Sequence, residues 1–180
     1  VGSESAYFMS INRNKRSIEL NFKNPAQVAL FKELILHADV VVENYRPGTM
    51  EKFGLGYDVL KEINPKIIYA ACSGFGHSGP YRDKPAYDII VQAMGGMMSI
   101  TGPEGGEPTR IGASVGDIIA GMFTAYGIAM ALFHRERTGA GQKVDVGMLD
   151  CQLAVLENAI ARYTTTGDIP RPLDNRHPSI

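Results

Sequence analysis

The feature that most constrains the fold is an apolar stretch at residues 111–133, IGASVGDIIAGMFTAYGIAMALF, whose only charged side chain is Asp117. From residue 118 onward, apolar side chains fall on every face of a helix, as expected for a helix buried inside a domain. The run is shorter than the roughly 18 apolar residues that a membrane span needs. Gly121 and Gly127 favour close packing of this helix in a core instead. The sequence therefore predicts a long core helix that begins at Asp117.

Asp117 has two possible roles. The small residues Ser114, Val115 and Gly116 precede it and leave room for a ligand beside its carboxylate. Unpaired N–H groups and the helix dipole would hold that carboxylate in the charged form that a nucleophile needs. Aspartate is also a favoured helix cap, so the pattern alone leaves both roles open. Asp150 is the rival carboxylate, although an ordinary charge at the start of a later helix explains it.

Composition excludes several classes of protein. The chain has 180 residues, 44% of them hydrophobic, and a net charge of −1. Near-neutral charge gives no bulk attraction to nucleic acid or to an anionic membrane. Cys72 and Cys151 lie far apart in apolar segments, which favours reduced, buried thiols and a cytoplasmic location, and no metal-ligand spacing is visible. Because Val1 is not an initiator residue and residues 175–180 contain no closing element, we expect a fragment of a longer protein.

Strand and helix patterns alternate along the chain. We predict strands at residues 17–22, 38–44, 66–72 and 142–146. We predict helices at residues 25–37, 49–53, 57–63, 87–98, 117–138 and 149–163. The β-branched, apolar strands are of the kind found in buried parallel sheets. This order predicts an α/β fold with a parallel sheet and flanking helices, followed by an irregular segment after Gly167.

Two loops follow predicted strands, where open α/β sheets bind ligands. The first contains Asn44, Tyr45 and Arg46, and Arg46 is well placed to bind a phosphate. The second, GFGHSG at residues 74–79, matches the dinucleotide-binding fingerprint letter for letter. However, a polar loop bracketed by prolines follows it instead of the required helix, so we interpret it as a flexible connection close to a ligand. His77 in this loop has no partner at metal-ligand or catalytic-triad spacing.

Five segments of the chain together resemble the class III CoA-transferase family, which also includes the α-methylacyl-CoA racemases. They are NRNKRSIEL (12–20), ADVVVENYRPG (38–48), LKEINPKIIYAACSGFGHSGPYRDKPAYD (60–88), IGASVGDIIAG (111–121) and ERTGAGQKVDVGMLD (136–150). The resemblance implies a Rossmann-like large domain, a small domain and two chains interlocked as rings. By this analogy, residues 1–166 are the central part of the CoA-binding large domain. Residues 167–180 then begin a linker toward a small domain that this sequence lacks.

The resemblance also implies site residues. Asp117 falls on the nucleophilic aspartate of the family's VGD motif. Contacts with coenzyme A are implied for Leu20, Lys23, Asn44, Tyr45, Arg46, Lys52, Lys84 and Tyr87. Some family members have glycine in place of Arg46. The family's glycine-rich active-site loop is expected beyond Ile180.

Three functions are consistent with the resemblance. A CoA-transferase would move CoA from an acyl-CoA to a carboxylic acid through an aspartyl mixed anhydride and an aspartyl-CoA thioester, without a metal, in a cytoplasmic homodimer. A racemase would pair the aspartate with a histidine, but this chain has Tyr87 there. A phenol with an ordinary pKa of about 10 is a poor acid or base near neutrality, which favours the transferase. The third alternative is a CoA-binding or dimer-scaffold remnant without activity.

Overall fold

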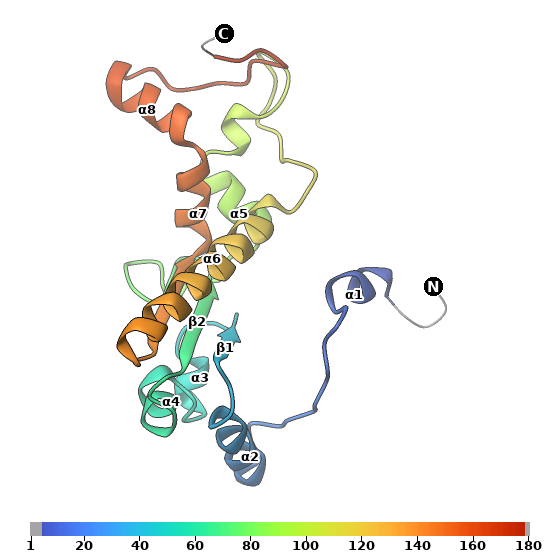
Figure 1. The fold of residues 1–180 in the computed structure, drawn as a ribbon. Coiled ribbons are helices and arrows are strands. Elements are labelled where there is room, and N and C mark those ends of the chain that lie inside the picture. The colour runs from blue at the N-terminus through green and yellow to red at the C-terminus, as the bar shows by residue number, and fades with distance from the viewer. Residues whose placement is uncertain (1–4, 179–180) are drawn as a thin grey trace.

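The computed structural model describes residues 5–178, which form an α/β fold around a three-stranded parallel sheet (Figure 1). The strands are β1 (Val40–Glu43), β2 (Ile68–Ser73) and β3 (Gln142–Gly147), in the spatial order β1-β2-β3. Val40 pairs with Ile68, and Ile68 pairs with Gln142, so the three strands start level with one another. The predicted parallel sheet is confirmed, and three of the four predicted strands form it.

Helices precede, connect and follow the strands. They are α1 (Ala6–Ile11), α2 (Pro25–Ile35), α3 (Thr49–Lys52), α4 (Tyr57–Ile63), α5 (Asp88–Met94), α6 (Val115–Thr138), α7 (Met148–Val155) and α8 (Glu157–Thr166), with a short 3-10 helix at Met98–Ile100. The predicted helix at 149–163 is divided into α7 and α8 at Leu156. Helix α6 packs against β2, β3, α5 and α7, whereas α2, α3 and α4 lie together around the start of the sheet (Figure 1).

Local sequence explains where the helices begin and end. The Asn24 side chain accepts the N–H of Ala26 at 3.0 Å, and Pro25 occupies the first turn of α2. Helix α6 ends at Gly139, whose φ of +75° closes the helix with a left-handed residue, as glycine allows. Both ends match the capping signals in the sequence.

Two apolar clusters cover β2 on opposite faces. The first joins β1 and β2 to α2, α3 and α4: Ile35, Val41, Met50, Leu55, Leu60, Ile67, Tyr69 and Ala71. The second joins α5, α6 and α7: Val91, Ala120, Met148 and Cys151, with Cys72 of β2 packed against it. Burial on both faces is what continuous apolar strands of a parallel sheet require.

The strand predicted at residues 17–22 is wrong. Residues 15–21 pair with no strand, and this segment runs with α1 away from the sheet (Figure 1). Of the alternating apolar residues, Ile18 is exposed, whereas the centre of the Phe22 ring lies 5.3 Å from that of Phe31 and 5.7 Å from that of Phe53. The Phe22 side chain is thus packed between α2 and the end of α3, and the segment forms no strand hydrogen bonds.

The prediction that α6 is buried on every face is also wrong. The fully buried residues of α6 are all small or polar, namely Gly116, Ala120, Thr124 and Ala131, and Ile119 packs half-buried beside them. The opposite face is open, with Met122 67% and Tyr126 66% exposed. Gly127 does pack closely, because a Cβ there would lie 2.8 Å from Val144, but no atom lies within 4 Å of such a Cβ at Gly121. The helix therefore has one face on the sheet and one apolar face outside.

The length argument against a membrane span also fails for α6. The helix has 24 residues and a mean hydropathy of 1.6 over its most apolar window, so length and composition alone would let it cross a bilayer. Its inward face, however, packs on β2 and β3. This packing, rather than its length, identifies α6 as part of the α/β layer.

Candidate active site

A cleft of about 840 Å³ opens where β1 and β2 end. Its walls come from the loops after these two strands, from residues 84–87 and from the first turns of α6. Six of the nine predicted site residues line it: Asn44, Tyr45, Arg46, Lys84, Tyr87 and Asp117. The structure therefore brings together residues that lie up to 73 positions apart in the sequence.

The other three predicted contacts do not line this cleft. Leu20 is half-buried in the unpaired segment before α2, while Lys23 and Lys52 are exposed. The N–H of Lys23 donates to the Asn21 side chain at 3.0 Å. Contact of these three residues with coenzyme A stays a prediction.

Asp117 is not the cap of α6. Ser114 is the cap residue, which puts Asp117 at the third position of the helix. The Asp117 residue is exposed, and its carboxylate has no hydrogen bond or ion pair with any residue from 5 to 178. A carboxylate that faces a cleft without a structural partner fits a reactive role better than a capping role.

Asp88, at the start of α5, replaces Asp117 as the hydrogen-bond acceptor at the N-terminal end of α6. Its buried carboxylate accepts the N–H of Gly116 at 2.8 Å through Oδ1. Gln92 Nε2 donates to both oxygens, at 3.0 and 2.9 Å, and the Arg110 guanidinium lies 3.3 Å from Oδ2. Gln92 Oε1 in turn accepts the N–H of Ile111 at 3.0 Å. Asp88 and Gln92 thus fix the segment that leads into Asp117.

The glycine before Asp117 permits this arrangement. A Cβ at Gly116 would lie 2.6 Å from a Val91 methyl carbon and 3.0 Å from Asp88 Oδ1. Any larger residue would therefore push α6 away from α5. Sequence reasoning missed Asp88 and Gln92, although two polar residues four apart on one face of an otherwise apolar helix were a usable signal.

The environment raises the pKa of Asp117. Loss of hydration against the cleft walls is the main cause, and the negative charge of Asp88 adds to it. The sequence argument, which expected the helix start to favour the charged form, gave the wrong direction. The main reason is that the cleft walls reduce the hydration of the carboxylate; in addition, Asp88 binds the Gly116 amide and brings a second negative charge to the same helix end.

Two cations and two anchored residues frame the rest of the cleft. Arg46 is exposed and has no ion pair with any residue from 5 to 178, and Lys84 Nζ lies 4.1 Å from the centre of the Tyr81 ring. Asn44 Nδ2 donates to the carbonyl of Cys72, and the Tyr45 N–H donates to Glu43 Oε2 at 2.7 Å. These contacts suit an anionic ligand that enters over the loop after β1.

Rival nucleophiles do not fit. Asp150 is exposed and does not line the cleft. Cys72 does line it, but burial raises the pKa of its thiol and so disfavours the thiolate; the pKa of Cys151 is raised to about 11 by the same cause. Both cysteines are free thiols, as predicted. Within residues 5–178, no group of three or more His, Cys, Asp or Glu side chains is arranged to hold a metal ion.

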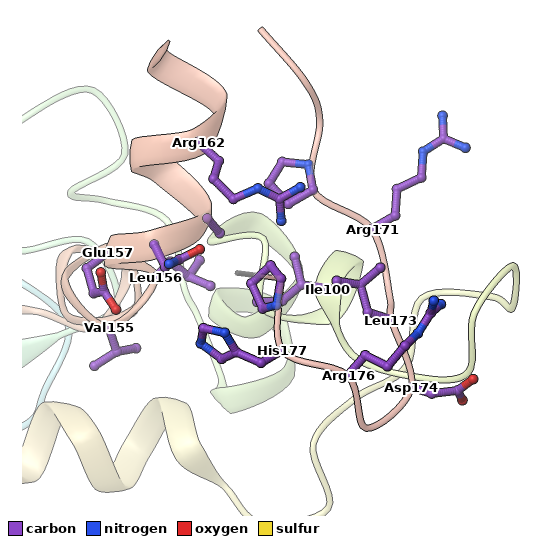
Figure 2. A pocket seen from close by; sticks show the side chains of 14 residues that line it. Ile100, Val155, Leu156, Glu157, Arg162, Arg171, Leu173, Asp174, Arg176 and His177 are labelled. Atoms are coloured by element: carbon purple, nitrogen blue, oxygen red, sulfur yellow. The ribbon is translucent and has the colours of Figure 1, made fainter. Parts of the chain in front are cut away.

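A second hollow, of about 210 Å³, lies between α8 and residues 170–178 (Figure 2). Arg162, Arg171 and Arg176 border it, but their guanidinium groups do not converge (Figure 2), and Arg176 pairs with Glu104. None of the predicted site residues lies there. We therefore place the candidate active site at the cleft beside Asp117.

Comparison with known proteins identifies the family. Residues 1–180 match the family model of CoA-transferase family III. This chain belongs to CoA-transferase family III. It is 49% identical over 179 residues to the acetyl-CoA:oxalate CoA-transferase of Acetobacter aceti, a match that covers 99% of this chain and 46% of that protein. It is 47% identical over 164 residues to the succinyl-CoA:glutarate CoA-transferase of Mus musculus, covering 91% of this chain and 37% of that protein.

A solved structure shows the same fold. The crystal structure of a CAIB/BAIF family protein from Brucella suis matches this family III chain with a TM-score of 0.94 and 42% sequence identity, covering 100% of this chain and 48% of that one. The chain spans about half the length of the relatives it matches. The division into residues 1–166 and a following linker stays a prediction; α8 ends at Thr166, and residues 167–178 contain no helix or strand.

Proposed function

We propose that the protein to which this chain belongs is a CoA-transferase that moves CoA from an acyl-CoA to a carboxylic acid, with Asp117 as the nucleophile. The observation that carries the proposal is the carboxylate of Asp117, which faces the cleft without a structural partner while Asp88 does the capping. The names of relatives that act on oxalate, succinyl and glutarate groups support carboxylic acids as substrates.

The first half of the proposed reaction removes the donor acid. An oxygen of Asp117 attacks the thioester carbonyl carbon, the C–S bond breaks, and CoA leaves as a thiolate with the bonding electrons. The product is a mixed anhydride between Asp117 and the donor acyl group. The thiolate then attacks the aspartyl carbonyl carbon, which expels the donor carboxylate and leaves an aspartyl-CoA thioester.

The second half is the reverse sequence with the acceptor. The acceptor carboxylate attacks the aspartyl-CoA thioester and releases CoA thiolate. The thiolate then attacks the acceptor's carbonyl carbon in the new anhydride, which yields the new acyl-CoA and regenerates the Asp117 carboxylate. Each nucleophile and each leaving group is an anion, so the cycle needs no net proton transfer.

The site's own residues would assist these steps. A raised pKa makes the Asp117 carboxylate more basic and therefore a better nucleophile, although the group must still be deprotonated to react. Each addition places negative charge on a carbonyl oxygen, which backbone N–H groups stabilise. The N–H of Asp117 has no backbone acceptor among residues 5–178 and is available for this purpose. Arg46 and Lys84 would bind phosphates of CoA.

No observation favours the racemase alternative. Such chemistry needs a second acid or base near neutral pH, and the cleft offers Tyr87 at the position in question. We also propose that the full-length protein is a cytoplasmic, interlocked homodimer. The apolar outer face of α6, which includes Met122, Tyr126 and Met130, supports burial against further protein.

The experiment is mass spectrometry of the full-length protein after incubation with a panel of acyl-CoAs and trapping with hydroxylamine. The proposal predicts a hydroxylamine-sensitive adduct on the peptide that contains Asp117, which is absent from Asp117→Ala. A protein that forms no adduct but exchanges the α-proton of an acyl-CoA with deuterated water would instead be a racemase.

A further inference from the structure

The proposed reaction leaves one cluster of ionisable side chains unexplained. It lies at the same end of the sheet as the cleft and includes His77, from the glycine-rich loop at residues 74–79. Glu43, the last residue of β1, and His77 have side chains only 4% and 9% exposed. Lys143 and Asp145 of β3 complete the cluster. Four ionisable side chains from three segments therefore meet next to the loop that carries Asn44, Tyr45 and Arg46.

The glycine-rich loop is held by a carboxylate of its own chain. Both oxygens of Asp145 accept the backbone N–H of His77, at 3.1 and 3.0 Å. Gly76, with a φ of +77°, allows the turn that presents this N–H. In a dinucleotide-binding loop, such an amide would bind phosphate. Here Asp145 takes it, so the loop serves to place the His77 side chain.

The contacts of the His77 ring define where its proton lies. Lys143 Nζ is 3.2 Å from His77 Nδ1. An ammonium group only donates hydrogen bonds, so Nδ1 must accept and the ring proton must be on Nε2. His77 Nε2 lies 3.4 Å from Glu43 Oε1, a close electrostatic contact rather than a well-directed hydrogen bond. The ring therefore stands between the cation of Lys143 and the carboxylate of Glu43.

Glu43 connects this cluster to the cleft. Its Oε2 accepts the N–H of Tyr45 at 2.7 Å, within the loop that lines the cleft. Burial raises the pKa of Glu43 and the charge of Glu51 adds to the rise, while the Tyr45 N–H and the charge of Lys143 act in the opposite direction. A buried carboxylate that lost these partners would be left uncompensated, and the loop that it holds would shift.

We propose that Lys143, His77 and Glu43 form a positioning chain that holds the Asn44-Tyr45-Arg46 loop in the conformation that binds acyl-CoA. The inference rests on the proposed function, because it assumes that this loop binds CoA. His77 is a positioning residue in this chain: it acts on the ligand through Glu43 and the Tyr45 amide.

Two substitutions at residue 77 separate its polar role from its size. In His77→Gln, the amide nitrogen can face Glu43, as Nε2 does in the wild type, and the amide oxygen can still accept from Lys143. His77→Leu keeps similar bulk but offers neither contact. In the full-length protein we expect His77→Leu to weaken CoA binding by about tenfold, the size of a lost hydrogen bond to a charged group, with kcat within about threefold of wild type. His77→Gln should bind CoA within about threefold of wild type.

CoA binding is measured by isothermal titration calorimetry, and KM and kcat by steady-state assay. A second readout does not depend on CoA: long-range ¹H–¹⁵N spectra of histidine-labelled protein, with the His77 signal assigned by its loss in His77→Gln, report which ring nitrogen carries the proton. The proposed positioning chain predicts that the His77 ring carries its proton on Nε2 alone. Lys143→Met, which removes the cation but not the ring, provides a further variant if His77→Leu does not fold.

The outcomes are distinct. Weak binding in His77→Leu or Lys143→Met, rescue in His77→Gln and an Nε2–H ring support the chain. A proton on Nδ1, or His77→Gln binding as weakly as His77→Leu, overturns it, as does unchanged binding in both His77→Leu and Lys143→Met. A wild-type protein that binds no CoA overturns the proposed function and the loop's role together, whereas the failures above leave CoA transfer itself intact.

Discussion

The substitution Asp88→Asn tests how this fold prepares the carboxylate of Asp117. Asparagine keeps the shape of Asp88, and its carbonyl oxygen can still accept the Gly116 N–H, which is now 2.8 Å from Oδ1. It removes a negative charge that raises the pKa of Asp117. The pKa of Asp117 should therefore fall, although burial continues to raise it.

The same change disturbs the segment before α6. The new NH₂ group replaces Oδ2, which now accepts from Gln92 at 2.9 Å and lies 3.3 Å from Arg110. Donor then meets donor at both contacts. Losing these charge-assisted bonds costs about 1–3 kcal/mol in the free energy of unfolding. A small misplacement of Asp117, added to its lower basicity, should reduce kcat by about tenfold or more.

The diagnostic assay is the pH dependence of kcat/KM. The active form of Asp117 is the carboxylate, so activity falls as pH drops through its pKa. Because the Asp88 charge raises that pKa, Asp88→Asn should move the acidic limb to lower pH. Asp58→Asn, which removes an exposed charge paired with Lys61, is the matched control and should leave the limb in place. An acidic limb that stays in place or moves to higher pH in Asp88→Asn would refute the reasoning.

Three further predictions follow from the same contacts. Burial and a like charge raise the pKa of Asp117, so its ionised form destabilises the folded state at any pH above the ordinary pKa of an aspartate. Asp117→Asn should therefore lose all transfer activity yet raise Tm at pH 7. An unchanged or lower Tm would contradict the pKa argument. Arg46→Ala should raise KM for acyl-CoA by about tenfold with little change in kcat, and KM should then depend less on salt concentration. Lys61→Ala, which removes a cation outside the cleft, should change neither KM nor its salt dependence. Gly127→Ala should lower the free energy of unfolding, measured by urea denaturation, by about 1–3 kcal/mol, because its Cβ would meet a β3 side chain at 2.8 Å. Gly121→Ala, whose Cβ would have no atom within 4 Å, should be neutral or stabilising by up to about 1 kcal/mol. Equal effects at the two glycines would refute the packing described for α6.

Much of the fold could be predicted because its strands are continuous β-branched runs and its helices carry capping signals. Those features act locally, and residues 38–44 and 66–72 became β1 and β2 as expected. The errors occurred where local pattern and long-range packing differ. The alternating segment before α2 forms no strand and instead packs Phe22 on α2, and α6 carries apolar side chains on a face that no described residue covers.

The site was predictable only in part. Asp117 and the loop after β1 followed from the family resemblance, and the structure brings them into one cleft. Asp88 was not predicted, since its role depends on an amide 28 residues away. His77 looked isolated in the sequence, because Lys143 lies 66 residues from it and Glu43 lies in a different strand. Spacing along the chain cannot reveal partners that the sheet brings together.

The covalent role of Asp117 is tested most directly by oxygen-18 transfer. The full-length protein is allowed to turn over with an acyl-CoA and an acceptor acid labelled in both carboxylate oxygens, and the peptide that contains Asp117 is then weighed. Because the acceptor oxygen that attacks aspartyl-CoA stays with Asp117 when the last anhydride is cleaved at the acceptor carbonyl, the proposed mechanism predicts one oxygen-18 atom in Asp117 after a single turnover. Product formation without oxygen-18 in that peptide would contradict the mechanism and place the transfer outside Asp117.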